Sequence, residues 1–369
     1  METKIQTRRF LFVDILEVLA IFLVVTYHGK TISHDFLAGP SFTTYFHYFV
    51  QTIACAGVSI FFFVNGFLLF GKRLTLEKHI RKILSFVLIT VFWAAIYVLS
   101  YFLIHNKPFS PGVSIIMMLN MDVQANINIL WYMGTLTGIY LFFPALKSLY
   151  DSNFKAFALF TAACGVVTVG FGFVYELIEL LTAILNLFFG ITVRTNIIGY
   201  NFLENFNPFT GTYGFAYFHF CMGGIAFKYY DKIIDISARK RNTIAFVGLI
   251  SACTMLFIWG VLRSYSDKEI YDVAFTQLNS LFAVIYIICL FVLSLNIKKE
   301  SKILKLISSN TLGIYLLHIL IIEMTKPYLM AMPHCANLPF TLVYGVFLVT
   351  SSLAIALLLK KIPYIRNFV

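Results

Sequence analysis

The chain has 369 residues, of which 60% are hydrophobic and 12% are charged, and its mean hydropathy is +0.84. Because soluble domains average about 25% charged residues, this composition excludes a soluble globular protein and predicts a polytopic membrane protein. The net charge of +11 would suggest nucleic-acid binding in a soluble protein. In this chain the basic residues cluster in alternate loops, so we attribute the charge to the positive-inside rule and expect no nucleic-acid partner.

Ten apolar segments are predicted to span the membrane. They occupy residues 10–28, 46–70, 83–104, 127–146, 156–175, 213–229, 243–262, 272–296, 303–325 and 338–359. We therefore predict an all-α fold, a helix bundle with about ten transmembrane helices that forms a single integral-membrane domain over residues 1–369. The first segment follows basic residues, as in a signal peptide. It is too long, carries two carboxylates and lacks a small-residue cleavage site, so we expect it to remain as the first span.

The distribution of lysine and arginine predicts the topology. One side of the predicted bundle holds 22 of the 28 Lys and Arg residues and the other side holds 6. The basic side contains both ends of the chain and the loops 71–82, 228–242 and 298–305. The positive-inside rule places this side in the cytoplasm. We expect a multi-pass protein of the cell (inner or plasma) membrane, with cytoplasmic N- and C-termini.

Two segments on the opposite side are not simple loops. Residues 105–126 contain an apolar stretch, Val113 to Leu119, that is too short to span. Residues 176–212 begin with a segment up to Phe189 that resembles an amphipathic or re-entrant helix. The remainder is rich in Asn, Gly and aromatic residues, as expected for a loop. Such residues also suit sugar binding, but a plain interfacial loop is the preferred explanation.

The first span carries the most unusual polar residues, Asp14, Glu17 and His28. A charged side chain inside a bilayer costs at least about 2.5–3.5 kcal/mol, so such residues usually face protein or water and serve a function. At about 100° per residue, Glu17 and His28 lie about 20° apart and Asp14 lies about 60° from Glu17. All three are therefore predicted to share one face of the helix, over about 21 Å of its length.

The second and third spans supply a small polar motif and a basic stretch. Asn65-Gly66 suits close helix packing and an interhelical hydrogen bond. Arg81 and Lys82 begin the third span, after basic residues in the preceding loop. These residues satisfy the topology signal and can snorkel, but arginine also binds phosphate bidentately. The candidate cofactor-binding residues are Arg81, Lys72, Arg73, Lys82 and Asn65.

The later spans add aromatic rings and histidines. Trp131 and Tyr132 open the fourth span, where an aromatic belt is the ordinary explanation, and we keep both as candidate substrate-binding residues. His219 in the sixth span is more simply explained as a hydrogen-bonded core residue. In the ninth span, Tyr315 and His318 approach the outer end, which places His318 at a depth similar to that of His28.

Six cysteines are present, five of them within apolar runs. Neither a C-x-x-C motif nor a Cys/His spacing typical of a metal site occurs. We interpret the cysteines as packing residues and predict no disulfide framework and no metal.

Together these segments resemble one family over nearly the whole chain, the membrane acyltransferase-3 proteins, which include O-acetyltransferases of bacterial surface polysaccharides. The resemblance rests on VDILEVLAIFLVVTYH in the first span, FFFVNGFLLFGKR in the second and ILWYMGTLTGIYLFFPAL in the fourth. FHFCMGGIAFKYYD in the sixth span and NTLGIYLLHILII in the ninth complete it. Among members, the chain is similar to small stand-alone proteins such as the enterobacterial-common-antigen acetyltransferase.

The resemblance implies an acyltransferase that moves acyl groups other than amino-acyl groups, with acetyl-CoA as the donor and a hydroxyl of a glycan or lipid-linked sugar as the acceptor. His28 is then the general base, since an unperturbed pKa of about 6.5 suits proton transfer near neutrality. Asp14 or Glu17 would orient the reacting groups. His318 or Tyr315 would position the acceptor or the developing oxyanion.

The chain departs from the family at Glu17 and, more mildly, at Asn65, where the family usually has Ser before Gly, and it leaves two other functions open. Eleven residues before the histidine, the family usually has Arg or Lys, where this chain has Glu17. A non-catalytic relative that acts as a membrane partner is therefore one alternative. The other is a transporter or flippase of a lipid-linked or acylated sugar, in which buried carboxylates and a histidine relay protons. No convincing internal repeat supports an inverted-repeat transporter.

Overall fold

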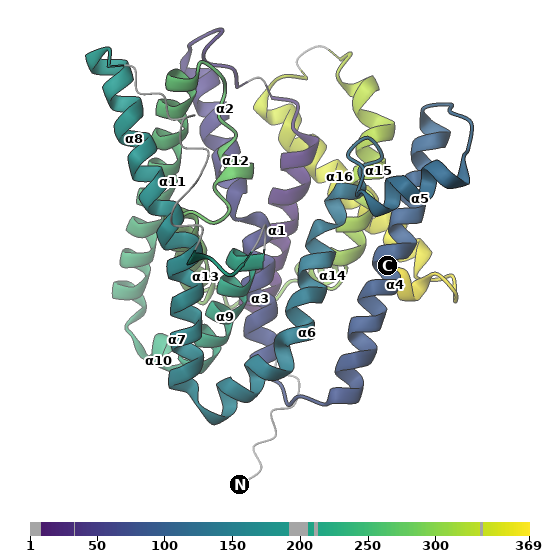
Figure 1. Ribbon diagram of the computed structural model, residues 1–369, viewed down its shortest axis with the longest axis horizontal. Helices are drawn as coiled ribbons and strands as arrows, with labels where there is room; N and C mark the ends of the chain where they lie inside the picture. Colours follow the sequence, from purple (N-terminus) through teal and green to yellow (C-terminus); the bar gives the residue numbers. More distant parts are fainter. Residues whose placement is uncertain (1–8, 33, 192–205, 210–212, 333–334) are drawn as a thin grey trace.

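The computed structural model describes residues 9–32, 34–191, 206–209, 213–332 and 335–369 (Figure 1). Within these ranges all regular structure is helical and no β-strand occurs. This result confirms the predicted all-α class. Most of the long helices run between the two ends of the molecule, as expected for a membrane bundle.

Long helices alternate with short helical turns along the chain. In chain order they are α1 (Leu11–Gly29), α2 (Phe42–Thr52), η1 (Ile53–Ala56), α3 (Gly57–Phe70), α4 (Leu76–Ile104), α5 (Pro111–Leu119), η2 (Ile127–Leu130), α6 (Trp131–Ser152), α7 (Phe154–Gly165), η3 (Val166–Gly170), α8 (Phe171–Phe189), α9 (Tyr213–Lys228), α10 (Tyr230–Asp235), α11 (Ala238–Asp267), α12 (Val273–Thr276), α13 (Leu281–Ser294), α14 (Lys302–Ser308), α15 (Thr311–Leu329), α16 (Leu338–Leu359) and η6 (Arg366–Phe368).

Each predicted span corresponds to helical structure, but fewer of the helices are full-length than expected. In the described part of the chain, eight helical stretches are long and apolar enough to cross a membrane. The predicted spans 213–229 and 272–296 are the exceptions. They contain α9, with 16 residues, and α13, with 14 residues. At about 1.5 Å per residue, α13 measures about 21 Å and falls short of the roughly 30 Å hydrocarbon core.

The segment up to Phe189 is helical, as predicted, but it continues the preceding helix and is not a separate re-entrant element. Helices α7 and α8 join through η3, a π-helical turn, into one stretch from Phe154 to Phe189. Glu179 of this segment has a partner in the neighbouring helix α11, because Nη1 of Arg263 lies 3.6 Å from Oε2 of Glu179. The loop that follows, with Arg194, lies mostly outside the described residues, as do Lys4 and Arg8 of the basic side.

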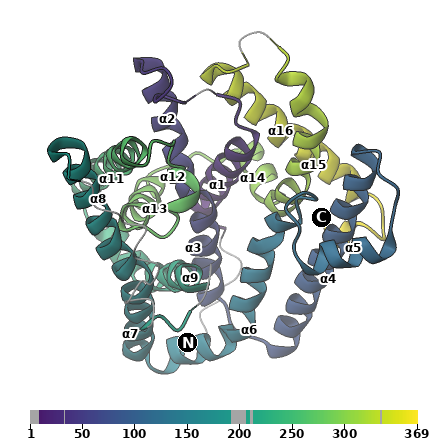
Figure 2. The ribbon, with the colours of Figure 1, turned by 45° about the horizontal axis from the view of Figure 1, so that its top comes forward.

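Helices α1 and α3 lie in the middle of the bundle (Figure 2). Helix α1 packs against α3, α15 and α16, and α3 packs along α9. Glycines make the α3–α9 contact possible. A Cβ atom on Gly66 would lie 1.8 Å from the carbonyl oxygen of Phe220, and one on Gly223 would lie 2.0 Å from that of Phe63. The two backbones therefore touch, which confirms the close packing predicted for Gly66.

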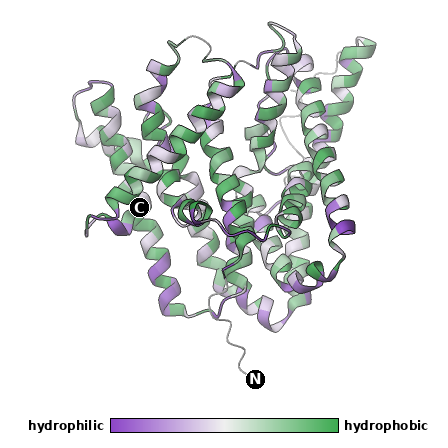
Figure 3. Cartoon of the chain, turned by 180° about the vertical axis from the view of Figure 1, so that it is seen from behind, coloured by the Kyte–Doolittle hydropathy of each residue, from purple (hydrophilic) through white to green (hydrophobic). Residues whose placement is uncertain are grey.

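The polar residues are distributed as a bilayer requires. The middle of the bundle is hydrophobic, and hydrophilic residues gather toward the ends, for example at the start of α4 (Figure 3). The α3–α4 and α6–α7 connections lie at the same end as the N-terminus, and the α1–α2 and α4–α5 connections lie at the other end (Figure 1). This alternation matches the one used to count basic residues. That the end of the bundle with the N-terminus lies in the cytoplasm stays a prediction.

Candidate functional site

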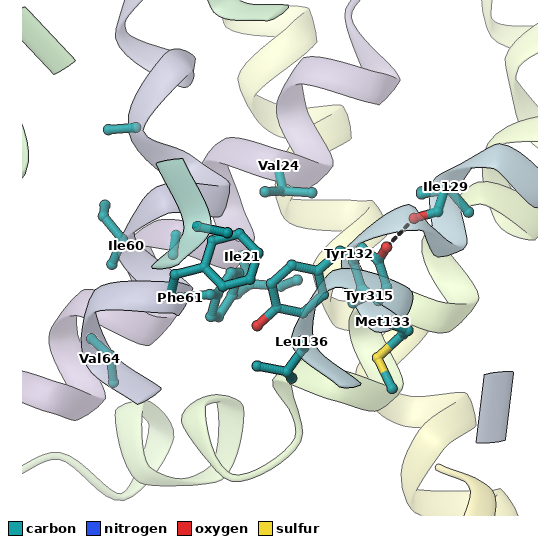
Figure 4. Close-up of a cluster of buried hydrophobic side chains, with 14 of the residues drawn as sticks. Ile21, Val24, Ile60, Phe61, Val64, Ile129, Tyr132, Met133, Leu136 and Tyr315 are labelled. Carbon is teal, nitrogen blue, oxygen red and sulfur yellow. Dashed lines mark hydrogen bonds between the residues drawn. The ribbon is translucent and has the colours of Figure 1, made fainter. Parts of the chain in front are cut away.

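A cavity of about 190 Å³ lies among α1, α3, α4, α6 and α15, and it contains five of the predicted site residues. These are Glu17, Asn65, Lys82, Tyr132 and Tyr315. The other lining residues are mostly apolar: Val24, Val58, Phe61, Phe86, Met133, Leu136, Tyr140, Thr311 and Leu312. Figure 4 shows part of this wall, with the ring of Phe61 from α3 next to that of Tyr132 from α6. Residues from both halves of the sequence thus meet around one cavity.

Two ionisable side chains, one acidic and one basic, line this cavity. Glu17 extends from α1 and is partly buried, whereas Lys82 lies one turn and a half into α4 and is exposed. The ammonium group of Lys82 lies 4.7 Å from the centre of the Phe86 ring, which is a favourable cation–π distance. Glu17 and Lys82 do not form an ion pair within 4.0 Å among the described residues. Both side chains are therefore available to a bound molecule.

The two histidines predicted at similar depth are neighbours. Nε2 of His318 lies 3.3 Å from Nδ1 of His28. Each Nδ1 also faces a backbone carbonyl, at 2.9 Å from Val24 for His28 and 2.6 Å from Tyr315 for His318. Because a carbonyl only accepts, both Nδ1 atoms carry hydrogen. His28 thus donates from Nδ1 toward Val24 and His318, and a neutral His28 has an unprotonated Nε2.

The histidine pair is joined to the cavity by its own hydrogen-bond partners. Val24 and Tyr315, whose carbonyls fix the two imidazoles, both line the cavity. His28 follows Val24 by one helical turn, and His318 follows Tyr315 by nearly one turn. Nε2 of His28 has no hydrogen-bond partner among the described residues. The arrangement therefore presents a proton acceptor just beyond the cavity, on the side away from Lys82.

The tyrosines on the cavity wall have mainly structural contacts. The hydroxyl of Tyr315 donates to the carbonyl of Ile129 in η2, as Figure 4 shows. The ring of Tyr132 packs edge-on against that of Tyr315, with the centres 5.5 Å apart. Tyr132 is buried inside the bundle, so the aromatic-belt interpretation is wrong for this residue. Trp131 packs against Phe215 and does not line the cavity.

Asp14 lies apart from the cavity although it shares a helix with Glu17. Its carboxylate accepts hydrogen bonds from Arg9, at 2.8 and 2.7 Å, and from Ser308, at 2.7 Å. The hydrogen bond to Asp14 also raises the pKa of Arg9. Asp14 therefore connects the start of α1 to α14, and its position suits a structural role.

The basic candidates divide into two groups. Lys82 lines the cavity, whereas Lys72, Arg73 and Arg81 are exposed around the α3–α4 connection. Arg81 forms an ion pair with Glu77 at 2.6 Å on the surface of α4. The exposed group lies at the N-terminal end of the bundle, outside the cavity. A long anionic molecule would have to extend out of the cavity to reach it.

Sequence reasoning missed Tyr140 and Thr311, which also line the cavity. The hydroxyl of Tyr140 lies 3.5 Å from Oδ1 of Asn65, and this contact joins α6 to α3 as expected for an interhelical asparagine. Tyr132, Leu136 and Tyr140 follow one another at intervals of four residues, which puts them on one helix face. That spacing is the signal that would have identified Tyr140.

His219 lies outside the cavity, as the core interpretation expects. Its Nδ1 lies 2.8 Å from the carbonyl oxygen of Phe215, and the side chain is buried in α9.

Similarity to known proteins is found at the level of the family. The family model described as an acyltransferase domain (acyltransferase-3) matches residues 10–360. No curated protein and no solved structure matches the chain.

Proposed function

Because the chain belongs to the acyltransferase-3 family, we propose that it moves an acetyl group from acetyl-CoA to a hydroxyl of a cell-surface polysaccharide or of its lipid-linked precursor. The helical bundle and the family both fit a multi-pass membrane acyltransferase. We infer the cell membrane as its location, with both termini in the cytoplasm, from the distribution of basic residues. Small stand-alone O-acetyltransferases of surface polysaccharides are the members that suggest this acceptor.

The observation that carries the proposal is the histidine pair beside the cavity. His28 has its Nδ1 hydrogen held by Val24 and His318, and its Nε2 is free to accept a proton. In the proposed reaction, Nε2 takes the proton of the acceptor hydroxyl as the oxygen bonds to the acetyl carbon. The carbon–sulfur bond then breaks, and the proton passes from His28 to the leaving thiolate. The positive charge that forms on His28 is shared with His318 through their contact.

The cavity dimensions suit the acyl end of the donor. A volume of about 190 Å³ lies below the roughly 300–1,000 Å³ of pockets that enclose drug-sized ligands. The acetyl group and part of its thioester arm fit this space, and the phosphates would then remain outside. Lys82 lies at the exposed side of the cavity, and Lys72, Arg73 and Arg81 lie beyond it, where they would bind the phosphates.

Glu17 gives this chain a carboxylate in the cavity, where other members usually have a cation. We propose that Lys82, from α4, supplies the positive charge on the cavity wall, and that Glu17 accepts hydrogen bonds from the donor arm or from the acceptor. Asn65 would contribute a further polar group on the same wall. Tyr315 would act through its backbone carbonyl on His318, because its hydroxyl proton is already donated to Ile129.

The test is acetyl transfer from labelled acetyl-CoA to glycan in membranes that contain the wild type or a variant. We expect His28→Ala to lower the rate by about 10²–10⁴-fold, the usual contribution of a general base. The matched control is His219→Gln, which alters a buried histidine outside the cavity and leaves transfer near the wild-type rate. Glu17→Gln and Glu17→Arg show whether the carboxylate itself contributes to transfer.

Two results would assign another function. Movement of a lipid-linked sugar across the membrane without consumption of acyl-CoA would identify a transporter. A cellular phenotype that persists in His28→Ala, with no transfer from any acyl donor, would identify a non-catalytic relative.

A further inference from the structure

A second, larger crevice of about 500 Å³ lies among α3, α9, α10, α11 and α13. Most of its wall is apolar: Phe63, Met222, Ile225, Ala226, Tyr229, Ile233, Ile236, Ile244, Ala245, Ile288, Cys289, Phe291 and Val292. Ile236 and Ile244 are also exposed on the outside of the bundle, so the crevice opens at the surface. None of the residues placed in the acyl-transfer site lines it.

Arg241, on the wall of this crevice, is a buried cation without an anionic partner in the described structure. The residue is only 9% exposed. Its Nη1 donates to the carbonyls of Ile233 and Ile234, at 3.0 and 3.2 Å, and its Nη2 donates to Oδ1 of Asn296 at 2.7 Å. Its Nε is buried and has no partner in the described part of the chain. Burial of a charge without a counter-charge is costly, which indicates that an anion completes this site.

Further positive charge lies at the same end of the crevice. Lys240, the preceding residue, also lines it and is exposed. Both residues belong to the first turn of α11, a helix of 30 residues whose capping residue, Ser237, makes no side-chain hydrogen bond to the helix. The start of a long helix carries partial positive charge. Asp231 and Asp235 on α10 are exposed, and neither forms an ion pair with Arg241 among the described residues.

We propose that this crevice binds an anionic phospholipid of the membrane. One acyl chain would occupy the apolar part of the crevice, and the phosphate would lie between Lys240 and Arg241. A soluble anion would match the charges but would leave the apolar wall uncovered. A zwitterionic lipid would match the wall but would bring a second cation next to Lys240. The combination of an apolar crevice with a guanidinium that lacks an anionic partner in the described structure therefore selects a lipid with net negative charge.

The test is native mass spectrometry of the full-length protein released from nanodiscs that contain equal amounts of phosphatidylglycerol and phosphatidylcholine. We expect the wild type to retain phosphatidylglycerol preferentially. Lys240→Gln removes one surface charge and lowers this preference about fivefold. Ile244→Glu places a carboxylate at the exposed opening and abolishes retention.

Matched controls separate this site from general attraction to the membrane surface. Lys232→Gln removes an exposed lysine of α10 that does not line the crevice, and Phe246→Glu changes an exposed residue of α11 outside it. Both controls retain phosphatidylglycerol as the wild type does. Equal retention of the two lipids, equal loss in variants and controls, or displacement of phosphatidylglycerol by inorganic phosphate would overturn the proposal.

Discussion

The two neighbouring imidazoles differ in what their second nitrogen contacts. Nε2 of His318 faces His28 at 3.3 Å, whereas Nε2 of His28 has no partner in the described structure. This difference separates the proposed roles, with His28 as the base and His318 as the residue that positions it. His318 lies on α15, so the orientation of the base depends on a helix far from it in the sequence.

Substitution of His318 tests this positioning role. We expect His318→Leu to lower kcat about five- to tenfold, the equivalent of one hydrogen bond, with little change in KM for the acyl donor. His318→Gln offers an amide oxygen to the Nδ1 hydrogen of His28 and should restore part of the loss. Steady-state kinetics of both variants provide the measurement. An equal loss in the two variants would show that the hydrogen bond to His28 is not what matters.

Asp14 should contribute to stability and not to chemistry, because its carboxylate contacts Arg9 and Ser308 and lies outside the cavity. We expect Asp14→Asn to weaken the attachment of α1 to α14 by about 1–3 kcal/mol and to lower the apparent melting temperature in detergent. The rate of the protein that remains folded should not change. A fall in the rate without a fall in the melting temperature would indicate that Asp14 takes part in the reaction.

The polar face of α1 shows how far sequence alone reaches at this scale. Helical spacing correctly indicated that Glu17 and His28 project toward related surroundings, the cavity and its border. Helical spacing did not show that Asp14 lies outside the cavity. Its offset of about 60° from Glu17 around the helix axis is enough to bring it next to a different helix. That neighbour, Ser308, is 294 residues away in the chain. The contact between His28 and His318 depends likewise on helix packing, which no local pattern encodes.

Among the contacts between helices, the α3–α9 contact requires glycine at particular positions. We expect Gly66→Ala to destabilise the protein by about 1–3 kcal/mol or more, as overpacked sites do, because the new methyl group meets the backbone of α9. Gly134→Ala is the matched control. It lies in α6, where a Cβ atom meets nothing within 4 Å, and should add about 0.5–1 kcal/mol of stability. Thermal unfolding of the two variants in detergent compares them directly.

The positions of the helices could be predicted more reliably than their lengths. Apolar length located all ten predicted segments, since burial in lipid requires it. It failed at the fifth segment, which was predicted to end at residue 175 and to be followed by an amphipathic or re-entrant helix up to Phe189. The structure joins α8 to α7 and places Arg263 of α11 beside Glu179. An ion pair between helices offsets the charge of Glu179, and the partner, on α11, cannot be identified from the segment itself.

For the whole molecule, the orientation in the membrane can be tested at a native residue. Five of the six cysteines are buried and Cys335, between α15 and α16, is partly exposed. The predicted topology puts Cys335 outside the cell, so a membrane-impermeant maleimide should label intact cells at this residue. Cys335→Ser removes the signal. Lys72→Cys in the Cys335→Ser background should react with the maleimide only after the cells are permeabilised. Its labelling in intact cells would contradict the predicted orientation.

The contact between His28 and His318 also imposes an order on biogenesis. The two residues are 290 positions apart, and a ribosome that adds about 5–20 residues per second needs about 15–60 s to cover that distance. Throughout this interval α1 has already been made, while the wall that will enclose its glutamate and histidine has not. During this time Glu17 and His28 of α1 lack their final surroundings. We expect α1 to stay beside the insertion machinery, or Glu17 to be protonated, until the later helices are inserted. Because α15 is made late, the site is completed only near the end of synthesis, and the polar residues of α1 remain without their partners until then.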